Sequence, residues 1–157
     1  MSTIIQGDEL RELVGGKYVT KTIASTTNAT QSMFTVVGLC IVKALIGEVV
    51  VAMDGTTTSI NVVHNPTIGS VADVNAATVV TSDAIGTVYG YLGVAINTLL
   101  VSTGTSVPGT VYAPITTQTA VFTPGVIGYQ GTATDAGSVK WHLLYVPLSD
   151  GASIVAA

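Results

Sequence analysis

Charged side chains are scarce in this sequence. Only 9% of the 157 residues are Asp, Glu, Lys or Arg, whereas 48% are hydrophobic; soluble domains usually carry about 25% charged residues. A lone soluble monomer normally covers its surface with such side chains. A surface of Thr, Ser, Asn and Gly therefore indicates one of two things: other chains cover much of it, or this is a Thr-rich β-protein of an oxidising or extracellular setting.

Basic residues are rarer still. The net charge is −4, and the 96 residues between Lys43 and Lys140 contain no Lys or Arg. Proteins that bind nucleic acid present a basic stripe or groove that neutralises phosphates. This sequence has too few Lys and Arg residues to form one. Direct nucleic-acid binding is not expected.

Cysteine and export signals are nearly absent. The single cysteine, Cys40, lies in an apolar run, so no disulfide framework can form within the chain, and we expect a small buried side chain there. The opening residues MSTIIQGDELREL place charges where a signal peptide has an apolar core. Export through the Sec pathway is therefore not expected.

Residues 36–53 form the longest apolar stretch, about the length of a membrane-spanning helix. The charges of Lys43 and Glu48 lie inside it, and Gly38 and Gly47 interrupt it. Because Val and Ile dominate, the stretch favours two strands around a bulge or turn at Gly47. We expect no membrane association.

Strand patterns cover the chain from Lys17 onward. Eight to ten short runs of β-branched and aromatic residues are separated by turn formers every eight to twelve residues. This predicts an all-β fold: an antiparallel β-sandwich, jelly-roll-like or a barrel. Residues 1–16 are predicted to form a charged N-terminal arm or short helix, and residues 17–157 a single β-domain.

The C-terminal stretch shows the strand pattern most plainly. The runs Val126–Gln130 and Val139–Val146 flank a segment rich in turn formers and are predicted to pair as a hairpin. In the second run Val139, Trp141, Leu143 and Tyr145 alternate with more polar neighbours, so one face is apolar throughout. Pro147 should end this strand.

Residues that could carry chemistry are few. His64 and His142 lie in separate predicted strands without metal-ligand spacing, no Ser lies in a GxSxG motif, and most carboxylates lie in turns. We predict no enzyme activity, no cofactor and no metal site. A hydrolase would need the two histidines to converge with an Asp such as Asp73 or Asp83. Aromatic residues, Tyr89, Tyr91 and Trp141 among them, could form a carbohydrate platform, although aromatics in strands are first expected in cores or interfaces.

Several segments resemble the decoration, or cement, proteins of tailed bacteriophage capsids. They are Thr30–Gly38, Leu45–Val49, Asn65–Gly69, Ala84–Tyr89 and Gly137–Ala152. The resemblance implies a β-sandwich or barrel that trimerises on the outer capsid face and bridges neighbouring capsomers. It also implies the major capsid protein and further copies of this chain as partners, and the capsid surface of a virion assembled in the host cytoplasm as the location.

Six residues are interface candidates under this interpretation: Asp8, Glu9, Arg11, Glu12, Trp141 and Tyr145. The first four make residues 1–16 a candidate arm that reaches a neighbouring subunit or the shell. Two alternatives stay open. One is a phage tail or fibre domain that binds host glycans, for which Tyr89, Tyr91 and Trp141 must be exposed together; the other is a hydrolase, for which His64 and His142 must meet.

Overall fold

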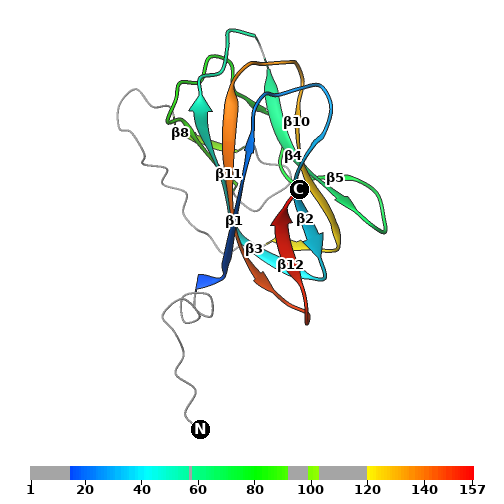
Figure 1. Cartoon of the computed structure of the whole chain (residues 1–157). Coiled ribbons are helices and arrows are strands. Elements are labelled where there is room, and N and C mark those ends of the chain that lie inside the picture. The colour runs from blue at the N-terminus through cyan, green and yellow to red at the C-terminus, as the bar shows by residue number, and fades with distance from the viewer. Residues whose placement is uncertain (1–14, 57, 92–98, 103–119) are drawn as a thin grey trace.

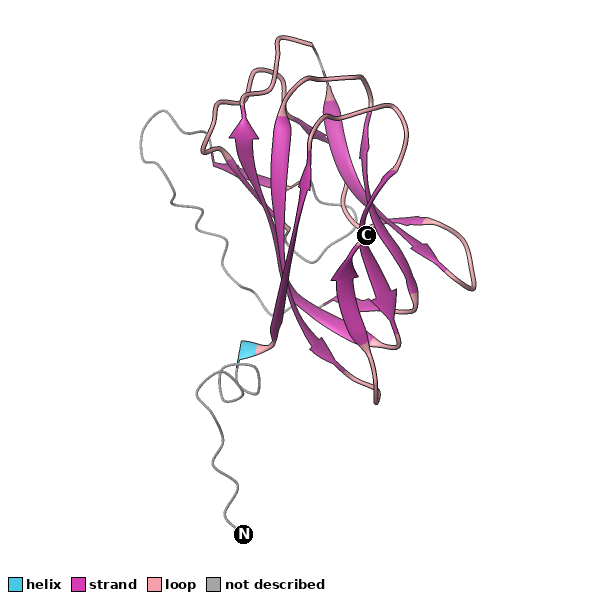
Figure 2. Cartoon of the chain, in the orientation of Figure 1, coloured by secondary structure: helices cyan, strands magenta, loops and turns pink. Residues whose placement is uncertain are grey.

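The protein forms a two-layer β-sandwich (Figure 1). The computed structural model describes residues 15–56, 58–91, 99–102 and 120–157. Within them are twelve strands in two six-stranded sheets, and every strand pair is antiparallel. Strands fill both layers (Figure 2). The predicted all-β sandwich is confirmed.

Sheet 1 is built around its three longest strands, in the order β1-β11-β3. The short strands β7 and β9 pair with different halves of β3 on its far side, and β8 extends the sheet beyond β7. The bounds are β1 Lys17–Ile23, β3 Cys40–Val51, β7 Val88–Gly90, β8 Leu100–Ser102, β9 Ala120–Phe122 and β11 Ser138–Pro147. Pro147 ends β11, as predicted, because it cannot donate to a ladder.

Sheet 2 has the order β12-β2-β10-β4-β5, with β6 also paired to β4. The bounds are β2 Gln31–Val37, β4 Ser59–Pro66, β5 Ala72–Asp73, β6 Thr78–Val79, β10 Gly125–Gly131 and β12 Ser153–Ala156. None of these strands contains Lys or Arg. Strand β12 lies in a C-terminal segment of mostly small residues.

The core lies between the two sheets and confirms the predicted apolar face of β11. Val139, Trp141, Leu143 and Tyr145 are all buried. Trp141 is opposite Gly47 of β3, and a Cβ on Gly47 would lie 3.1 Å from the indole ring. The ring also meets Tyr129 of sheet 2 edge to face, with centroids 5.6 Å apart. The Trp141 side chain therefore packs on the neighbouring strand β3 of its own sheet and on β10 of the opposite sheet.

Gly47 does not interrupt its strand, contrary to the expected bulge or turn. Strand β3 runs through it without a break, because its missing side chain makes room for Trp141. The chain turns instead at Gly38, whose φ is +71°. Residues 36–53 thus comprise the end of β2, that turn and all of β3.

The predicted hairpin of Val126–Gln130 and Val139–Val146 is wrong. The corresponding strands β10 and β11 lie in different sheets, and so do β3 and β4, although each pair is consecutive in the sequence. The intervening loops cross between the layers. Asp135 fixes one crossing: its Oδ1 accepts hydrogen bonds from the backbone N–H groups of Asp54 (3.1 Å) and Gly137 (2.7 Å). Its own backbone pairs with Thr26 in both directions at 3.2 Å. Asp135 therefore ties three loops together at one end of the sandwich.

Candidate interaction surface on the outer face of sheet 1

The outer face of sheet 1 is set by the register of β1, β11 and β3. Since the inward residues of β11 are the odd-numbered ones from Val139, the side chains of His142 and Leu144 point away from the core. His142 is opposite Thr20 of β1 and Ile46 of β3, and Leu144 is opposite Tyr18. We call the outward residues of these strands and β9 the sheet 1 face. They are Tyr18, Thr20, Thr22, Ile41, Lys43, Ala44, Ile46, Glu48, Val121, Lys140, His142, Leu144 and Val146.

Apolar side chains dominate the sheet 1 face. Tyr18 is 62% exposed, Val121 55% and Ile46 41%. Leu144 and Val146 are half-buried between them. Single exposed apolar residues are ordinary, but a group that covers four adjacent strands is typical of a surface that another molecule covers.

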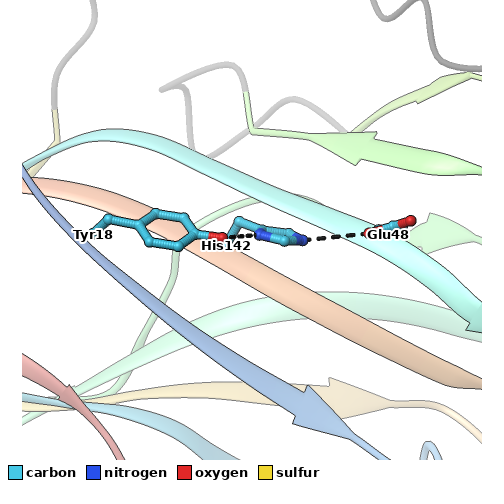
Figure 3. A network of polar contacts seen from close by, with 3 residues as sticks. All are labelled: Tyr18, Glu48 and His142. Carbon is cyan, nitrogen blue, oxygen red and sulfur yellow. Dashed lines mark hydrogen bonds and ion pairs between the residues drawn. The ribbon is translucent and has the colours of Figure 1, made fainter. Parts of the chain in front are cut away.

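A polar network crosses the middle of this face (Figure 3). The Tyr18 hydroxyl hydrogen-bonds to Nδ1 of His142, and Nε2 of His142 lies 3.5 Å from a carboxylate oxygen of Glu48. The Tyr18 and His142 rings also stack, with centroids 5.9 Å apart. Each residue comes from a different strand, so the network holds the imidazole between a phenol and a carboxylate and orients it on the surface.

His64 and His142 do not meet. His142 lies on the outer face of sheet 1, whereas His64 belongs to β4 of sheet 2. The His64 ring packs edge to face on Phe122, and its Nε2 is 3.1 Å from the carbonyl oxygen of Thr123. Burial lowers the pKa of His64, and that contact partly offsets the effect. Among the described residues there is no cluster of three or more His, Cys, Asp and Glu that could hold a metal ion. The two histidines therefore do not form the shared site that the hydrolase alternative requires.

The predicted aromatic candidates lie in the core. Trp141 is 0% exposed, Tyr145 4% and Tyr89 0%. Burial, together with a 2.8 Å hydrogen bond from its hydroxyl to Asp83, raises the pKa of Tyr89. Tyr91 is half-buried, and burial raises its pKa too. The interface role expected of Trp141 and Tyr145 needs exposed side chains, so on the protomer surface that expectation is wrong. So is the shared aromatic platform.

The other four interface candidates, Asp8, Glu9, Arg11 and Glu12, lie outside the described residues.

All four lysines of the chain lie on neighbouring strands of sheet 1. Lys17 and Lys21 are on β1, Lys140 is on β11 and Lys43 is on β3. Glu48 is the single acidic residue of these three strands. The Lys21 ammonium group donates to the carbonyl oxygen of Ala157 at the edge shared with sheet 2. Sheet 1 is thus the basic side of an otherwise acidic protein.

Sequence reasoning missed Tyr18, Ile46 and Val121. A signal was available for Tyr18 and Ile46, because both occupy outward positions once Val19 and Leu45 are assigned to the core. The network of Tyr18, His142 and Glu48 had no such signal. It depends on strand pairings across up to 124 residues of sequence.

A second exposed apolar side chain lies at the opposite sheet. Ile68, in the loop between β4 and β5, is 92% exposed beside a hollow of about 440 Å³ lined by Thr67, Ile68, Thr123 and Pro124. The loop is held at its base by a 2.8 Å hydrogen bond from the Thr67 N–H to the carbonyl oxygen of Pro124. The same loop also exposes Val71, but neither residue lies on a strand of the sheet, so we rank this site below the sheet 1 face.

In the part of the chain that the structure describes, no helix has the length and apolar character needed to cross a membrane. Comparison with known proteins gives no relative: no family model, no curated protein and no solved structure matches this chain.

Proposed function

We propose that this chain is a non-enzymatic decoration protein of a tailed-bacteriophage capsid. It trimerises on the outer face of the shell and stabilises the contacts between capsomers of the major capsid protein. The observation that carries the proposal is the sheet 1 face, where Tyr18, Ile46 and Val121 are exposed together on a rigid sheet.

The sheet 1 face can be covered by another protein at a low desolvation cost. An interface forms at low cost when few charged groups must lose their hydration, and permanent interfaces are accordingly more apolar than transient ones. The sheet 1 face has one network, of Tyr18, His142 and Glu48, whose polar groups already bond to one another. Apart from the ammonium groups of Lys43 and Lys140, the remaining contact area is hydrocarbon with a few hydroxyl groups. Such a surface suits a flat, lasting contact with a protein shell.

The chemistry of the face also favours a protein partner over a glycan. Sugar-binding sites typically present several exposed aromatic rings, whereas Tyr18 is the one tyrosine of the sheet 1 face, and Tyr89 and Trp141 are completely buried. The tail or fibre alternative therefore has no described aromatic platform to support it, and we do not pursue it.

Shell binding is expected to depend on Ile46. The Ile46→Glu variant places a carboxylate in the centre of the proposed contact, and its desolvation should weaken binding at least about tenfold. The measurement is co-sedimentation of the purified chain with shells assembled from the major capsid protein of the same virus. The matched control is Ile68→Glu, which makes the same change at an exposed residue away from the sheet 1 face.

Wild-type protein and the Ile68→Glu variant should pellet with the shells in a saturable manner, while Ile46→Glu stays in the supernatant. Circular dichroism and melting curves confirm that both variants are folded. If the wild-type chain does not pellet, the capsid function is excluded. If both variants bind equally well, the function survives and the sheet 1 face is not the contact.

A further inference from the structure

The chain contains two Asp–Gly sequences, Asp54–Gly55 and Asp150–Gly151. An aspartate before glycine is prone to spontaneous rearrangement, because glycine has no side chain to hinder attack by its backbone nitrogen on the neighbouring carboxyl group. The two sequences have the same chemistry, so a difference in their reactivity must come from the fold. The fold holds one of the two carboxylates in place and leaves the other without a partner.

Hydrogen bonds hold the Asp54 carboxylate. Its Oδ1 accepts a hydrogen bond from the backbone N–H of Thr56 at 2.6 Å, and its Oδ2 accepts one from the N–H of Ala136 at 3.3 Å. Hydrogen bonding to Thr56 is the main cause that lowers the pKa of Asp54, so this group is ionised at neutral pH. A backbone nitrogen attacks a neutral carboxyl group more readily than an anion. Reaction at Asp54 therefore requires that both bonds break and that the carboxylate takes up a proton.

The Asp150 carboxylate has no such restraint. Asp150 and Gly151 are exposed, and among the described residues neither this carboxylate nor the N–H of Gly151 makes a hydrogen bond. The two residues are the centre of a turn closed by a 3.0 Å hydrogen bond from the N–H of Ala152 to the carbonyl oxygen of Ser149. Gly151 has a φ of +73°, and a Cβ there would meet nothing within 4 Å. Both reacting groups are thus unrestrained and have open space around them.

From this contrast we propose that Asp150 is a site at which the folded protein converts aspartate to isoaspartate, whereas Asp54 is protected. The backbone nitrogen of Gly151 attacks Cγ of the protonated Asp150 carboxyl group and forms a five-membered succinimide ring. The hydrogen of that nitrogen and the hydroxyl group of the carboxyl leave together as water. A second water molecule then opens the ring at either carbonyl. One opening restores aspartate, and the other leaves the main chain running through Cγ. Water is the only co-reactant.

Isoaspartate would add one carbon to the main chain of a turn that is anchored on both sides. The Ser149 Oγ accepts a hydrogen bond from the N–H of Leu39 at 3.1 Å, and Ala152 is buried. With both anchors in place, the longer turn is expected to lose the bond from Ala152 to Ser149. The start of β12, which pairs with β2 alone at the edge of sheet 2, should therefore loosen. This modification goes beyond the proposed function and does not depend on it.

The test compares the two sites within one chain. The purified full-length protein is incubated in mildly acidic buffer, isoaspartate at each site is quantified by peptide mass spectrometry, and hydroxylamine cleavage detects the succinimide. Isoaspartate should form at Asp150 at least about ten times faster than at Asp54, because even one lost hydrogen bond to a charged group costs about that factor. In denaturing urea the two rates should become similar, because the unfolded chain restrains neither site.

Two variants identify the chemistry at this position. Asp150→Asn passes through the same succinimide, with ammonia in place of water as the leaving group, and should give the same products faster. Asp150→Glu would require a six-membered ring and should give no isomerised product. Hydrogen exchange of the Ala152 amide, measured on the separated isoaspartate form, should be faster than in the unmodified protein.

Equal rates at the two sites in the folded protein overturn the proposal, and so does a folded protein that forms no isoaspartate at Asp150. A difference that persists in urea also overturns it, because the fold would then not be its cause. Unchanged exchange at Ala152 would contradict the expected loosening of β12. The assay uses no capsid, so its failure leaves the proposed function standing, and failure of shell binding leaves this site standing.

Discussion

Replacing Trp141 with alanine is expected to lower the free energy of unfolding by about 3 to 5 kcal/mol, the range for deleting a large buried aromatic side chain. The indole is completely buried, packs over Gly47 and meets Tyr129 of the other sheet. Gly47, on which the indole packs, has no side chain that could fill the space. The measurement is chemical denaturation monitored by circular dichroism.

Two further variants make the cause of that loss identifiable. Trp141→Phe keeps most of the hydrocarbon and removes the indole N–H, which is buried without a hydrogen-bond partner among the described residues. It should therefore cost much less than the alanine change. Tyr18→Ala removes an exposed aromatic ring of the same sheet and should shift stability by about 0.5 kcal/mol or less. Similar losses for Trp141→Ala and Tyr18→Ala would contradict the assignment of Trp141 to the core.

Replacing Asp135 with alanine is expected to cost about 2 to 4 kcal/mol, because the backbone N–H groups of Asp54 and Gly137 lose their common acceptor. Asp135 is completely buried, so water does not freely replace the carboxylate. The same residue holds the β10–β11 crossing against Thr26. Denaturation by urea measures the loss, and hydrogen exchange of the Asp54 and Gly137 amides reports the freed donors.

The matched change for this residue is Asp135→Asn, which keeps an oxygen in place of Oδ1 and should retain more stability than alanine. Asp150→Ala removes a carboxylate from an exposed turn and should have little effect. If Asp135→Ala were as mild as Asp150→Ala, the Asp135 carboxylate would not be what holds the three loops together.

The alternation along β11 was sufficient to predict its two faces, because a half-buried strand repeats every two residues and one face had only Val, Trp, Leu and Tyr. The same pattern misplaced the partners. It assigned Val126–Gln130 to a hairpin with β11, whereas the loop between them crosses to the other sheet. Turn-rich composition indicates that a chain reverses; it does not indicate which layer the next strand joins.

The candidate surface was less predictable than the fold for a related reason. Scarcity of charge indicated that other molecules cover the surface, but the exposed group of Tyr18, Ile46 and Val121 forms only when β1, β3 and β9 lie on one face. Trp141 and Tyr145 attracted attention because they are aromatic, and for the same reason they are buried first. Which of these two groups is exposed depends on the register of strand pairing, and that register is set by long-range packing.

We propose that this charge-poor surface belongs to an assembly. The most direct measurement is the mass of the purified full-length chain in solution by light scattering on a size-exclusion column. The account predicts a stable trimer with a mass close to three times 15.9 kDa, unchanged on dilution. A monomer at all concentrations would contradict it.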